Sequence, residues 1–384
     1  MSIATHLAQG HCDARFRALA DRFESLLASG AEPGGAIAVV ADGRLVVDLW
    51  GGTNDRETGT PWHEDTLACC FSVTKGVLSL LALRLAEQGR LDLSARVADL
   101  WPGFETGGKA AITVGDIMRH RSGLPAVSPD FQEGDLYDWP TITQALAASS
   151  PTVPLDGPPV YQNMTYGYLL GEVLQRAGGA LLPALIAAEL TGPLDADFHI
   201  ALNDAAIDRC ATLSQDDPGG LFRAIAEAPD SLFARSMTGF DRRETFNTSR
   251  WRRAAIGSGS GHATARAIAK LYDQLVAKDG LIGPSLQALA RLETGRCAGD
   301  DPILGVPIRY GTGFELSLPP SLDFGPNPST AGYWGAGGAL GFADPEAGVA
   351  FGYVTRHMAA ELGCSARGRA LVTALYDAVG GDQR

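Results

Sequence analysis

The chain has 384 residues, a formal net charge of −13 and a sequence pI near 5.0. Hydrophobic residues make up 45% of it and the mean hydropathy is +0.02, which is typical of a globular protein with about two or three structural units. The acidic balance and the lack of any lysine or arginine run argue against a nucleic acid or an anionic membrane surface as partner.

Neither the N-terminal residues nor the cysteine pattern indicates a location outside the cytoplasm. Residues 1–13 have no basic and no apolar segment of a signal peptide, and the densest apolar run, 77–85, is too short to span a bilayer. No C-x-x-C pair and no histidine at ligand spacing accompanies the six cysteines, which are Cys12, Cys69, Cys70, Cys210, Cys297 and Cys364. We expect buried free thiols in a reducing compartment, with no metal and no cofactor.

The first elements in chain order are a helix and a hairpin. Apolar residues recur at helical spacing over 12–29. Two β-branched runs within 35–52 flank Asp42 and Gly43, a pair typical of a tight hairpin turn. Residues 53–66 are polar and loop-like, and the chain then returns to the core.

The next predicted helix begins at Ser72. Its apolar residues between Val77 and Leu85 are too dense for one amphipathic stripe, so most of this helix should be buried. Ser72 is a residue type that caps helix N-termini, and Gly89 is typical of the position after a C-terminus.

Ser72 and Lys75 share one face of the first turn of this helix. One interpretation is a serine cap beside a solvated lysine. The other is chemical: the chain has only four lysines, and an amine in an apolar helix is partly desolvated, which lowers its pKa. Such an amine can take the proton of a nearby hydroxyl, and a helix N-terminus favours developing negative charge. The pair suggests acyl transfer through a serine ester.

The middle of the chain alternates helices with a long loop. Thr113 to Asp116 is a start typical of a capping box, and residues 126–160 should form a surface excursion around a small helix near 141–148. Residues 210–255 combine arginines with aromatic side chains and are a candidate flap over a pocket. Further helices are predicted over 166–177, 180–195, 263–278, 284–292 and 365–379.

The last segment is predicted to be β-rich. Strands are expected over 310–316 and 348–355, and the intervening 333–342 is rich enough in glycine for a close backbone or ligand approach. Strands near both ends with helices between them predict an α+β fold, in which a sheet built from both termini carries a helical insertion. The predicted units are a discontinuous sheet domain, 1–71 with 300–384, and a mostly helical domain, 72–299, with the site at their interface.

Three ordered motifs carry a family resemblance: Ser72-x-x-Lys75, Tyr161-x-Asn163 and the glycine-rich strand near 333–338. In this order they resemble the serine β-lactamase/DD-peptidase superfamily, closest to its class C-like branch with bacterial carboxylesterases and some acyltransferases. The similarity runs from the hairpin near residue 36 to the C-terminal helix. It implies an antiparallel sheet flanked by helices plus a mostly helical inserted domain.

The resemblance also implies roles for single residues. Ser72 is similar to the family nucleophile, Lys75 to its activating amine, and Tyr161 to the tyrosine that takes the serine proton and returns it to the leaving group. The backbone N–H groups of Ser72 and Ala336 would form the oxyanion hole. A cation beside Tyr161 should stabilise its phenolate. By itself Tyr161 is an aromatic residue at a helix start, and only the motif order favours catalysis.

One departure from the family bears on the substrate. Penicillin-recognising relatives carry Lys-Thr-Gly on the strand beside the site, where the lysine helps to bind a carboxylate. Here Tyr333-Trp334-Gly335 matches, and a shift of one residue would put Trp334 at the lysine position; neither alignment supplies a cation. We expect weak binding of anionic β-lactams and an aromatic wall for neutral acyl groups. Asn163 either touches the substrate or hydrogen-bonds at the helix start.

The sequence therefore predicts a serine hydrolase that cleaves small-molecule carboxylic esters through acyl-Ser72. The alternatives are an acyltransferase, an amidase or a weak β-lactamase that uses the same centre, or a non-catalytic ligand-binding relative. No Gly-x-Ser-x-Gly elbow is present, because 257–261 has the wrong phase, and His120 and His262 are interpreted as structural. The oligomeric state is left open, with a homo-oligomer included.

Overall fold

The computed structural model describes these parts of the chain: 7–127, 131–132, 134–215, 225–239, 246–297, 299–360 and 365–380. Within these ranges no single helix has the length and apolar composition needed to cross a membrane. One bent pair, Thr165–Gly178 with Leu182–Leu194, meets that test only when its two helices are taken together.

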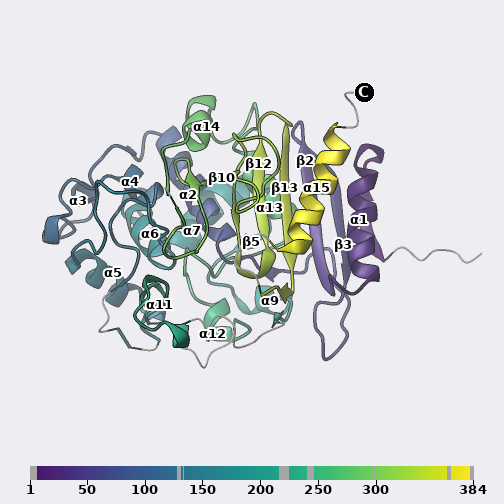
Figure 1. Cartoon of the computed structure of the whole chain (residues 1–384), viewed down its shortest axis with the longest axis horizontal. Helices are drawn as coiled ribbons and strands as arrows, with labels where there is room; N and C mark the ends of the chain where they lie inside the picture. The colour runs from purple at the N-terminus through teal and green to yellow at the C-terminus, as the bar shows by residue number, and fades with distance from the viewer. Residues whose placement is uncertain are drawn as a thin grey trace, which may run out of the picture.

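A nine-stranded antiparallel sheet lies at the centre of the fold (Figure 1). Its strand order is β1-β3-β2-β13-β12-β11-β10-β9-β8, so a strand from the start of the chain, β2, pairs with β13 near the end. This confirms the predicted α+β fold with a sheet built from both termini. The strands in sheet order are β1 Ala8–Cys12, β3 Arg44–Gly52, β2 Gly34–Ala41, β13 Val349–Thr355, β12 Leu340–Asp344, β11 Ala331–Trp334, β10 Glu315–Leu316, β9 Arg309–Tyr310 and β8 Gly295–Arg296.

β2 and β3 form the predicted hairpin around Asp42 and Gly43. Both residues have positive φ angles, 49° and 72°, as a type I′ turn requires. All eight residues of β2 are buried, and its sequence of small and β-branched residues suits a strand covered on both faces. β2 therefore lies in the middle of the core, next to β13.

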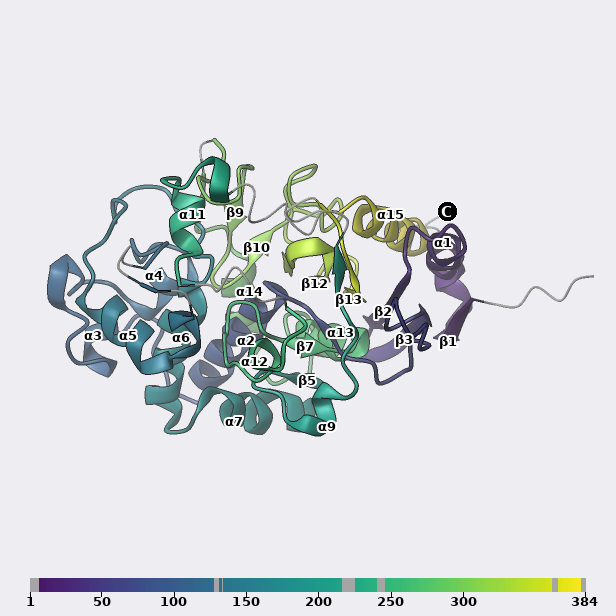
Figure 2. The same ribbon diagram turned by 90° about the horizontal axis from the view of Figure 1, so that it is seen from below.

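Helices cover both faces of this sheet (Figure 2). α1 and α15 pack against each other on one face, and α13 lies on the other face against β13, β2 and β12. Gly352 of β13 permits this approach, because a Cβ there would lie 2.2 Å from the carbonyl oxygen of Ala265. These three helices are α1 Arg17–Ala28, α13 Ala265–Asp273 and α15 Ala366–Gly380.

α2 (Val73–Glu87) links the helical part of the molecule to the sheet, since it contacts α6, α13 and β11. Twelve of its fifteen residues are buried, as predicted. Gly89, at φ 68°, ends the helix, and the amides of Gly89 and Arg90 donate to the carbonyl oxygens of Ala86 and Leu85. The other helices are α3 Val97–Leu100, α4 Val114–Met118, α5 Trp139–Ala148, α6 Thr165–Gly178, α7 Leu182–Ile186, α8 Gly192–Leu194, α9 Asp204–Ile207, α11 Leu232–Ser236, α12 Ser249–Arg252 and α14 Pro284–Arg291.

Two small sheets and five short helical turns complete the described elements. The capping box predicted at Thr113 and Asp116 is present at the start of α4. The small sheets pair β4 Ala68–Cys69 and β5 Phe198–His199 with β7 His262–Ala263, and β6 Ser214–Gln215 with β14 His357–Met358. The short turns are η1 Ala14–Phe16, η2 Thr106–Gly108, η3 Asp135–Tyr137, η4 Ala187–Thr191 and η5 Ala336–Gly338.

Two predicted elements were wrong in detail. The strand expected over 310–316 is a tight β9–β10 hairpin in which Glu315 lies opposite Tyr310, and Gly313, at φ 88°, permits the reversal. The helix expected from residue 12 begins only after β1, which pairs with β3 at the sheet edge. The three central residues of β1 are exposed, so β1 lacks the apolar alternation that marks a strand.

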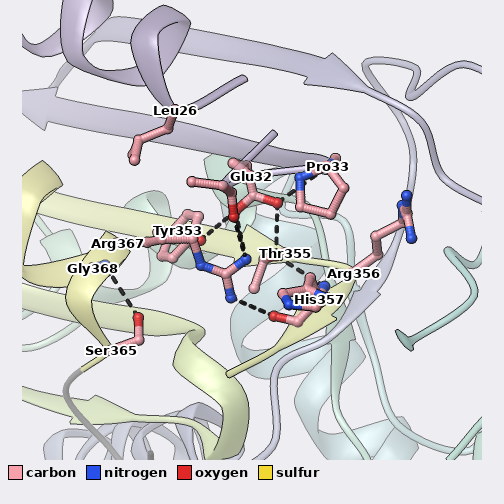
Figure 3. Close-up of polar contacts among 12 residues, drawn as sticks. Leu26, Glu32, Pro33, Tyr353, Thr355, Arg356, His357, Ser365, Arg367 and Gly368 are labelled. Carbon is pink, nitrogen blue, oxygen red and sulfur yellow. Dashed lines mark hydrogen bonds and ion pairs between the residues drawn. The ribbon is translucent and has the colours of Figure 1, made fainter. Parts of the chain in front are cut away.

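A cluster of buried polar residues joins the segment just before β2 to β13 and α15 (Figure 3). The Glu32 carboxylate accepts hydrogen bonds from the Tyr353 hydroxyl, from the Thr355 hydroxyl at 2.9 Å and from the Gly34 amide at 3.1 Å. Arg367 of α15 lies 3.7 Å from the same carboxylate and also donates to the carbonyl oxygen of His357 at 2.5 Å. The cluster therefore connects the C-terminal helix with the start of β2.

The described cysteines are free thiols. Cys69, Cys70, Cys210 and Cys297 are buried and Cys12 is half-buried, while Cys364 lies outside the described residues. Burial raises the pKa of Cys69 to about 12, so this thiol is inert at neutral pH. The cytoplasmic setting and the domain boundaries stay predictions.

Candidate active site

The junction of β4 and α2 places the Ser72 hydroxyl. Phe71 adopts a left-handed backbone, φ 44°, and this strained turn delivers Ser72 at the start of the helix. The predicted cap was wrong in its chemistry, because the Ser72 side chain makes no capping hydrogen bond. Ser72 Oγ instead accepts from Lys75 Nζ at 3.0 Å and from the Tyr161 hydroxyl at 2.8 Å. The structure thus brings the three predicted side chains together.

Lys75 is a buried amine on the first turn of α2. Its side chain is fully buried, and Nζ also donates to the carbonyl oxygen of Ser258 at 3.1 Å. The amine lies 4.8 Å from the centroid of the Tyr161 ring. Burial lowers the pKa of Lys75 to about 7, although the charge of Glu315 acts in the opposite direction. A substantial fraction of this amine is therefore neutral near pH 7 and can accept a proton.

Tyr161 is held by its backbone in the segment before α6. Its amide donates to Asp301 Oδ2 at 2.8 Å, and the amide of Gln162 donates to His120 Nδ1 at 3.0 Å. The His120 ring stacks on the Tyr161 ring with centroids 5.2 Å apart. These contacts keep a phenol that is only 3% exposed aimed at Ser72.

The protonation of Tyr161 differs from the expectation. Burial, with the negative charge of Glu315, raises the pKa of Tyr161 well above the ordinary value, so its phenol is protonated at neutral pH. The expectation that a neighbouring cation stabilises the phenolate was wrong, because desolvation of the buried ring is the larger effect. Lys75 is therefore the better proton acceptor of the pair, and Tyr161 the better donor.

The two histidines are structural, as interpreted from the sequence. His120 has both ring nitrogens engaged, since Nε2 lies 3.1 Å from the Tyr333 hydroxyl. Burial and the charge of Lys75 lower the pKa of His120 well below its usual value, so the ring is neutral. His262 Nδ1 lies 2.9 Å from the carbonyl oxygen of Ser260.

The glycine-rich turn after β11 closes against the start of α2. A Cβ at Gly335 would lie 2.4 Å from the carbonyl oxygen of Cys70, so only glycine lets the turn come this close to the residues before Ser72. Ala336 and Gly337 then border the same pocket as Ser72. Ser72 and Ala336 therefore border one cavity, and the oxyanion hole formed by their N–H groups stays a prediction.

A cavity of about 340 Å³ opens above Ser72 and Tyr161. Phe233 and Phe246, which line it, belong to the candidate flap 210–255, of which 216–224 and 240–245 lie outside the described residues. Most of the lining is apolar and includes Phe71, Met164, Trp251, Leu304, Leu322 and Met358. Such a wall suits an uncharged organic group rather than an ion.

Two of the four predicted substrate-binding residues line the pocket, and two do not. Asn163 and Trp334 line the pocket, and Asn163 Nδ2 donates to Ser236 Oγ at 3.2 Å and to Met237 Sδ at 3.1 Å. Tyr333 was wrongly placed on the wall, because it is fully buried behind the pocket and contacts His120. Gly335 acts through its backbone approach to Cys70 rather than by lining the cavity.

Three contributors were missed from the sequence. The Ser258 carbonyl fixes Lys75, Asp301 holds the backbone of Tyr161, and Glu315 lines the pocket. Only Ser258 had a signal in the sequence, because it lies in the glycine-serine segment 257–261, which resembles a Gly-x-Ser-x-Gly motif but has the wrong phase. Among the described residues no group of three or more histidine, cysteine, aspartate or glutamate side chains has the arrangement of a metal site.

A family model and several known proteins resemble the chain over part or most of its length. The family model described as "Beta-lactamase" matches residues 19–375. The chain is 33% identical over 369 residues to the esterase/beta-lactamase LipL of Mycobacterium tuberculosis. This alignment covers 92% of this chain and 84% of LipL. It is 32% identical over 178 residues to the esterase EstB of Burkholderia gladioli, covering 42% of this chain and 45% of EstB.

Solved structures match the whole fold. The crystal structure of a family VIII carboxylesterase superposes with a TM-score of 0.84 at 31% identity, covering 97% of this chain and 99% of that one. A penicillin-binding protein homologue from Caulobacter crescentus superposes with the same TM-score at 34% identity and the same coverage.

Proposed function

Because the chain belongs to the beta-lactamase family, we propose that it is a serine carboxylesterase that cleaves small-molecule esters through an acyl-Ser72 intermediate. The observation that carries this proposal is the convergence of Lys75 and Tyr161 on Ser72 Oγ, at 3.0 Å and 2.8 Å, beside an apolar pocket. The likeness to an esterase/beta-lactamase and to a family VIII carboxylesterase supports it.

Acylation uses the neutral fraction of Lys75. Ser72 Oγ attacks the ester carbonyl carbon while its proton passes to Lys75 Nζ, and the amides of Ser72 and Ala336 stabilise the oxyanion. When the tetrahedral intermediate collapses, the carbon–oxygen bond to the alcohol breaks. The Tyr161 hydroxyl protonates the departing alkoxide, and the Lys75 ammonium returns a proton to Tyr161.

Deacylation repeats these transfers with water. The same groups take a proton from the attacking water molecule, and the acid leaves when Ser72 Oγ regains its proton. No metal or cofactor is needed for either half of the cycle, because every transferred proton has a donor and an acceptor among Ser72, Lys75, Tyr161 and the substrate.

The pocket favours neutral esters over anionic β-lactams. Trp334 lines the cavity and Tyr333 contacts His120 behind it, so neither residue that could match the lysine of penicillin-recognising relatives supplies a cation. With no cation contributed by this strand, a substrate carboxylate loses a charge-assisted hydrogen bond. We therefore propose uncharged acyl and alcohol groups for the substrate.

The experiment is a panel of p-nitrophenyl esters of increasing acyl length, run beside a chromogenic cephalosporin. We expect ester hydrolysis to exceed cephalosporin hydrolysis by at least about a hundredfold. Ser72→Ala should lower ester hydrolysis about a thousandfold or more, while the matched control Ser94→Ala, at an exposed serine, should keep it. A fully active Ser72→Ala variant would contradict the proposal.

Two further readouts separate the alternatives. A fluorophosphonate probe should label Ser72, and intact mass spectrometry detects the adduct; failure to label would support a non-catalytic ligand-binding protein instead. Adding an acceptor alcohol tests acyl transfer. If the acyl group goes mainly to the alcohol while water is in large excess, the protein is an acyltransferase that uses the same centre.

A further inference from the structure

Glu315 is a buried acid in the same pocket as the proposed nucleophile. It lies on β10, is 2% exposed and borders the cavity together with Ser72 and Tyr161. Its Oε2 has no hydrogen-bond partner among the residues that the structure describes. Buried carboxylate oxygens are normally paired, so an unpaired one beside a reaction centre calls for an explanation.

The missing partner is explained if the carboxyl group carries a proton. Burial raises the pKa of Glu315 to about 8, although the charge of Lys75 and the backbone amide of Trp334 act in the opposite direction. Burial also lowers the pKa of Lys75 to about 7. A neutral acid beside a neutral amine has the same total charge as an ion pair, but it avoids desolvating two ions.

The surroundings supply little that would hold Glu315 ionised. The neighbouring phenols have pKa values raised by burial and are neutral, and the His120 ring is neutral as well. Asp301 is a second buried acid, and burial raises its pKa too. The titratable groups that interact with Glu315 or Lys75 are Tyr161, Tyr272, Tyr310, Tyr333, His120 and Asp301.

We propose that Glu315 holds the proton that Lys75 gives up, so that the resting site contains a neutral carboxyl group and an amine free to take the Ser72 proton. In this exchange an N–H bond of the Lys75 ammonium breaks and an O–H bond forms on Glu315. Glu315 stays protonated during acylation, which keeps a negative charge away from the developing oxyanion. It acts through Lys75 and is a positioning residue. The inference rests on the proposed acyl-Ser72 chemistry.

The test is the pH dependence of Ser72 labelling by a fluorophosphonate, which needs no knowledge of the natural ester. In the wild type the rate should rise as Lys75 deprotonates near pH 7 and fall as Glu315 ionises near pH 8. In Glu315→Gln the side chain is always neutral. The alkaline limb should disappear, and the acid limb should stay in place, because the Glu315 carboxyl group that glutamine replaces is already neutral where Lys75 deprotonates.

Glutamine mimics the protonated acid but cannot ionise, so the readout is the alkaline limb of the pH profile rather than the rate at a single pH. The matched control is Asp273→Asn, because burial raises the pKa of Asp273 to about 6 and this residue does not border the pocket; both limbs should be kept. An alkaline limb that persists in Glu315→Gln would overturn the inference, as would a large loss of rate at every pH.

An infrared difference spectrum provides a readout without catalysis. The wild type should show the carbonyl band of a protonated carboxyl group that is lost near pH 8, and Glu315→Gln should lack it. A band that persists in the variant would overturn the assignment. If the probe fails to label wild-type Ser72, the proposed function falls, whereas the infrared band still reports where the proton resides.

Discussion

Glu32 and Glu315 are both buried, at 1% and 2% exposure, but their surroundings differ. In the cluster of Figure 3, Glu32 has three hydrogen-bond donors and the guanidinium of Arg367. Glu315 keeps one carboxylate oxygen without a partner among the described residues and has the pocket beside it. The same side chain is thus satisfied in one region and left titratable in the other.

The difference separates a structural acid from a chemical one. Burial raises the pKa of Glu32 as well, but Arg367 and the hydrogen bonds act against the rise and give both carboxylate oxygens partners. Arg367 also donates to Ala31 and His357 carbonyl oxygens, which makes the cluster a tie between three parts of the chain. Around Glu315 few contacts would be lost on a change of protonation, which is what a proton store requires.

The largest expected effect concerns Glu32, the structural acid of this comparison. Glu32→Ala leaves the Arg367 guanidinium buried without its carboxylate, and we expect a loss of about 3–5 kcal/mol in the free energy of unfolding. Urea denaturation measures it. The double variant Glu32→Leu with Arg367→Met should recover part of the loss, and a double variant as unstable as the single one would show that the charge pair is not the cause.

A second prediction concerns Gly335, in the glycine-rich turn beside Ser72. In Gly335→Ala the new Cβ meets the Cys70 carbonyl oxygen, so the turn bearing Ala336 must move away from Ser72. We expect labelling of Ser72 to slow about a hundredfold. Gly299→Ala, where a Cβ meets nothing within 4 Å, is the control and should label at the wild-type rate. Wild-type labelling by Gly335→Ala would rule out an oxyanion contact from this turn.

A third prediction compares stability across pH. Because the pKa of Glu315 is raised to about 8 in the folded state, the folded protein binds more protons than the unfolded chain between pH 4.5 and 8, and stability should fall as pH rises through this window. The lowered pKa of Lys75 should make stability rise with pH from about 7 to 10.5. Urea unfolding of Glu315→Gln at several pH values should show the fall weakened; an unchanged slope would contradict the assignment.

The smallest expected effect concerns Asn163, whose amide already has partners in Ser236 and Met237. Asn163→Ala should raise KM for a p-nitrophenyl ester by less than about tenfold and leave kcat nearly unchanged. Steady-state kinetics measure both. A large fall in kcat would instead show that Asn163 contacts the reacting group in the transition state.

Local chemistry was readable from the sequence where the residues that matter are close together. Ser72 and Lys75 stand three residues apart, and the Asp42–Gly43 turn is a two-residue signal. Tyr161 came only from the resemblance, because 89 residues separate it from Ser72. Ser258 lies 183 residues from Lys75, so no spacing rule could have linked them.

Other elements were missed because they lack an apolar signature. β1 is an exposed edge strand, and the β9–β10 hairpin reverses at glycines that looked like part of one strand. Glu315 is the clearest case. A charged residue within a predicted strand is ordinarily solvent-exposed, and only the closed fold shows that it is buried beside Lys75.

The pairing of β2 with β13 has a consequence for biosynthesis. Ala41 lies opposite Val349, so the middle of the sheet cannot form until the ribosome has made almost the entire polypeptide. Until then the hairpin of β2 and β3 exposes an unpaired apolar edge that is prone to association with other nascent chains. Contacts of such high sequence separation also predict slow folding. Recombinant production should therefore gain from slower translation at low temperature, or from added chaperones.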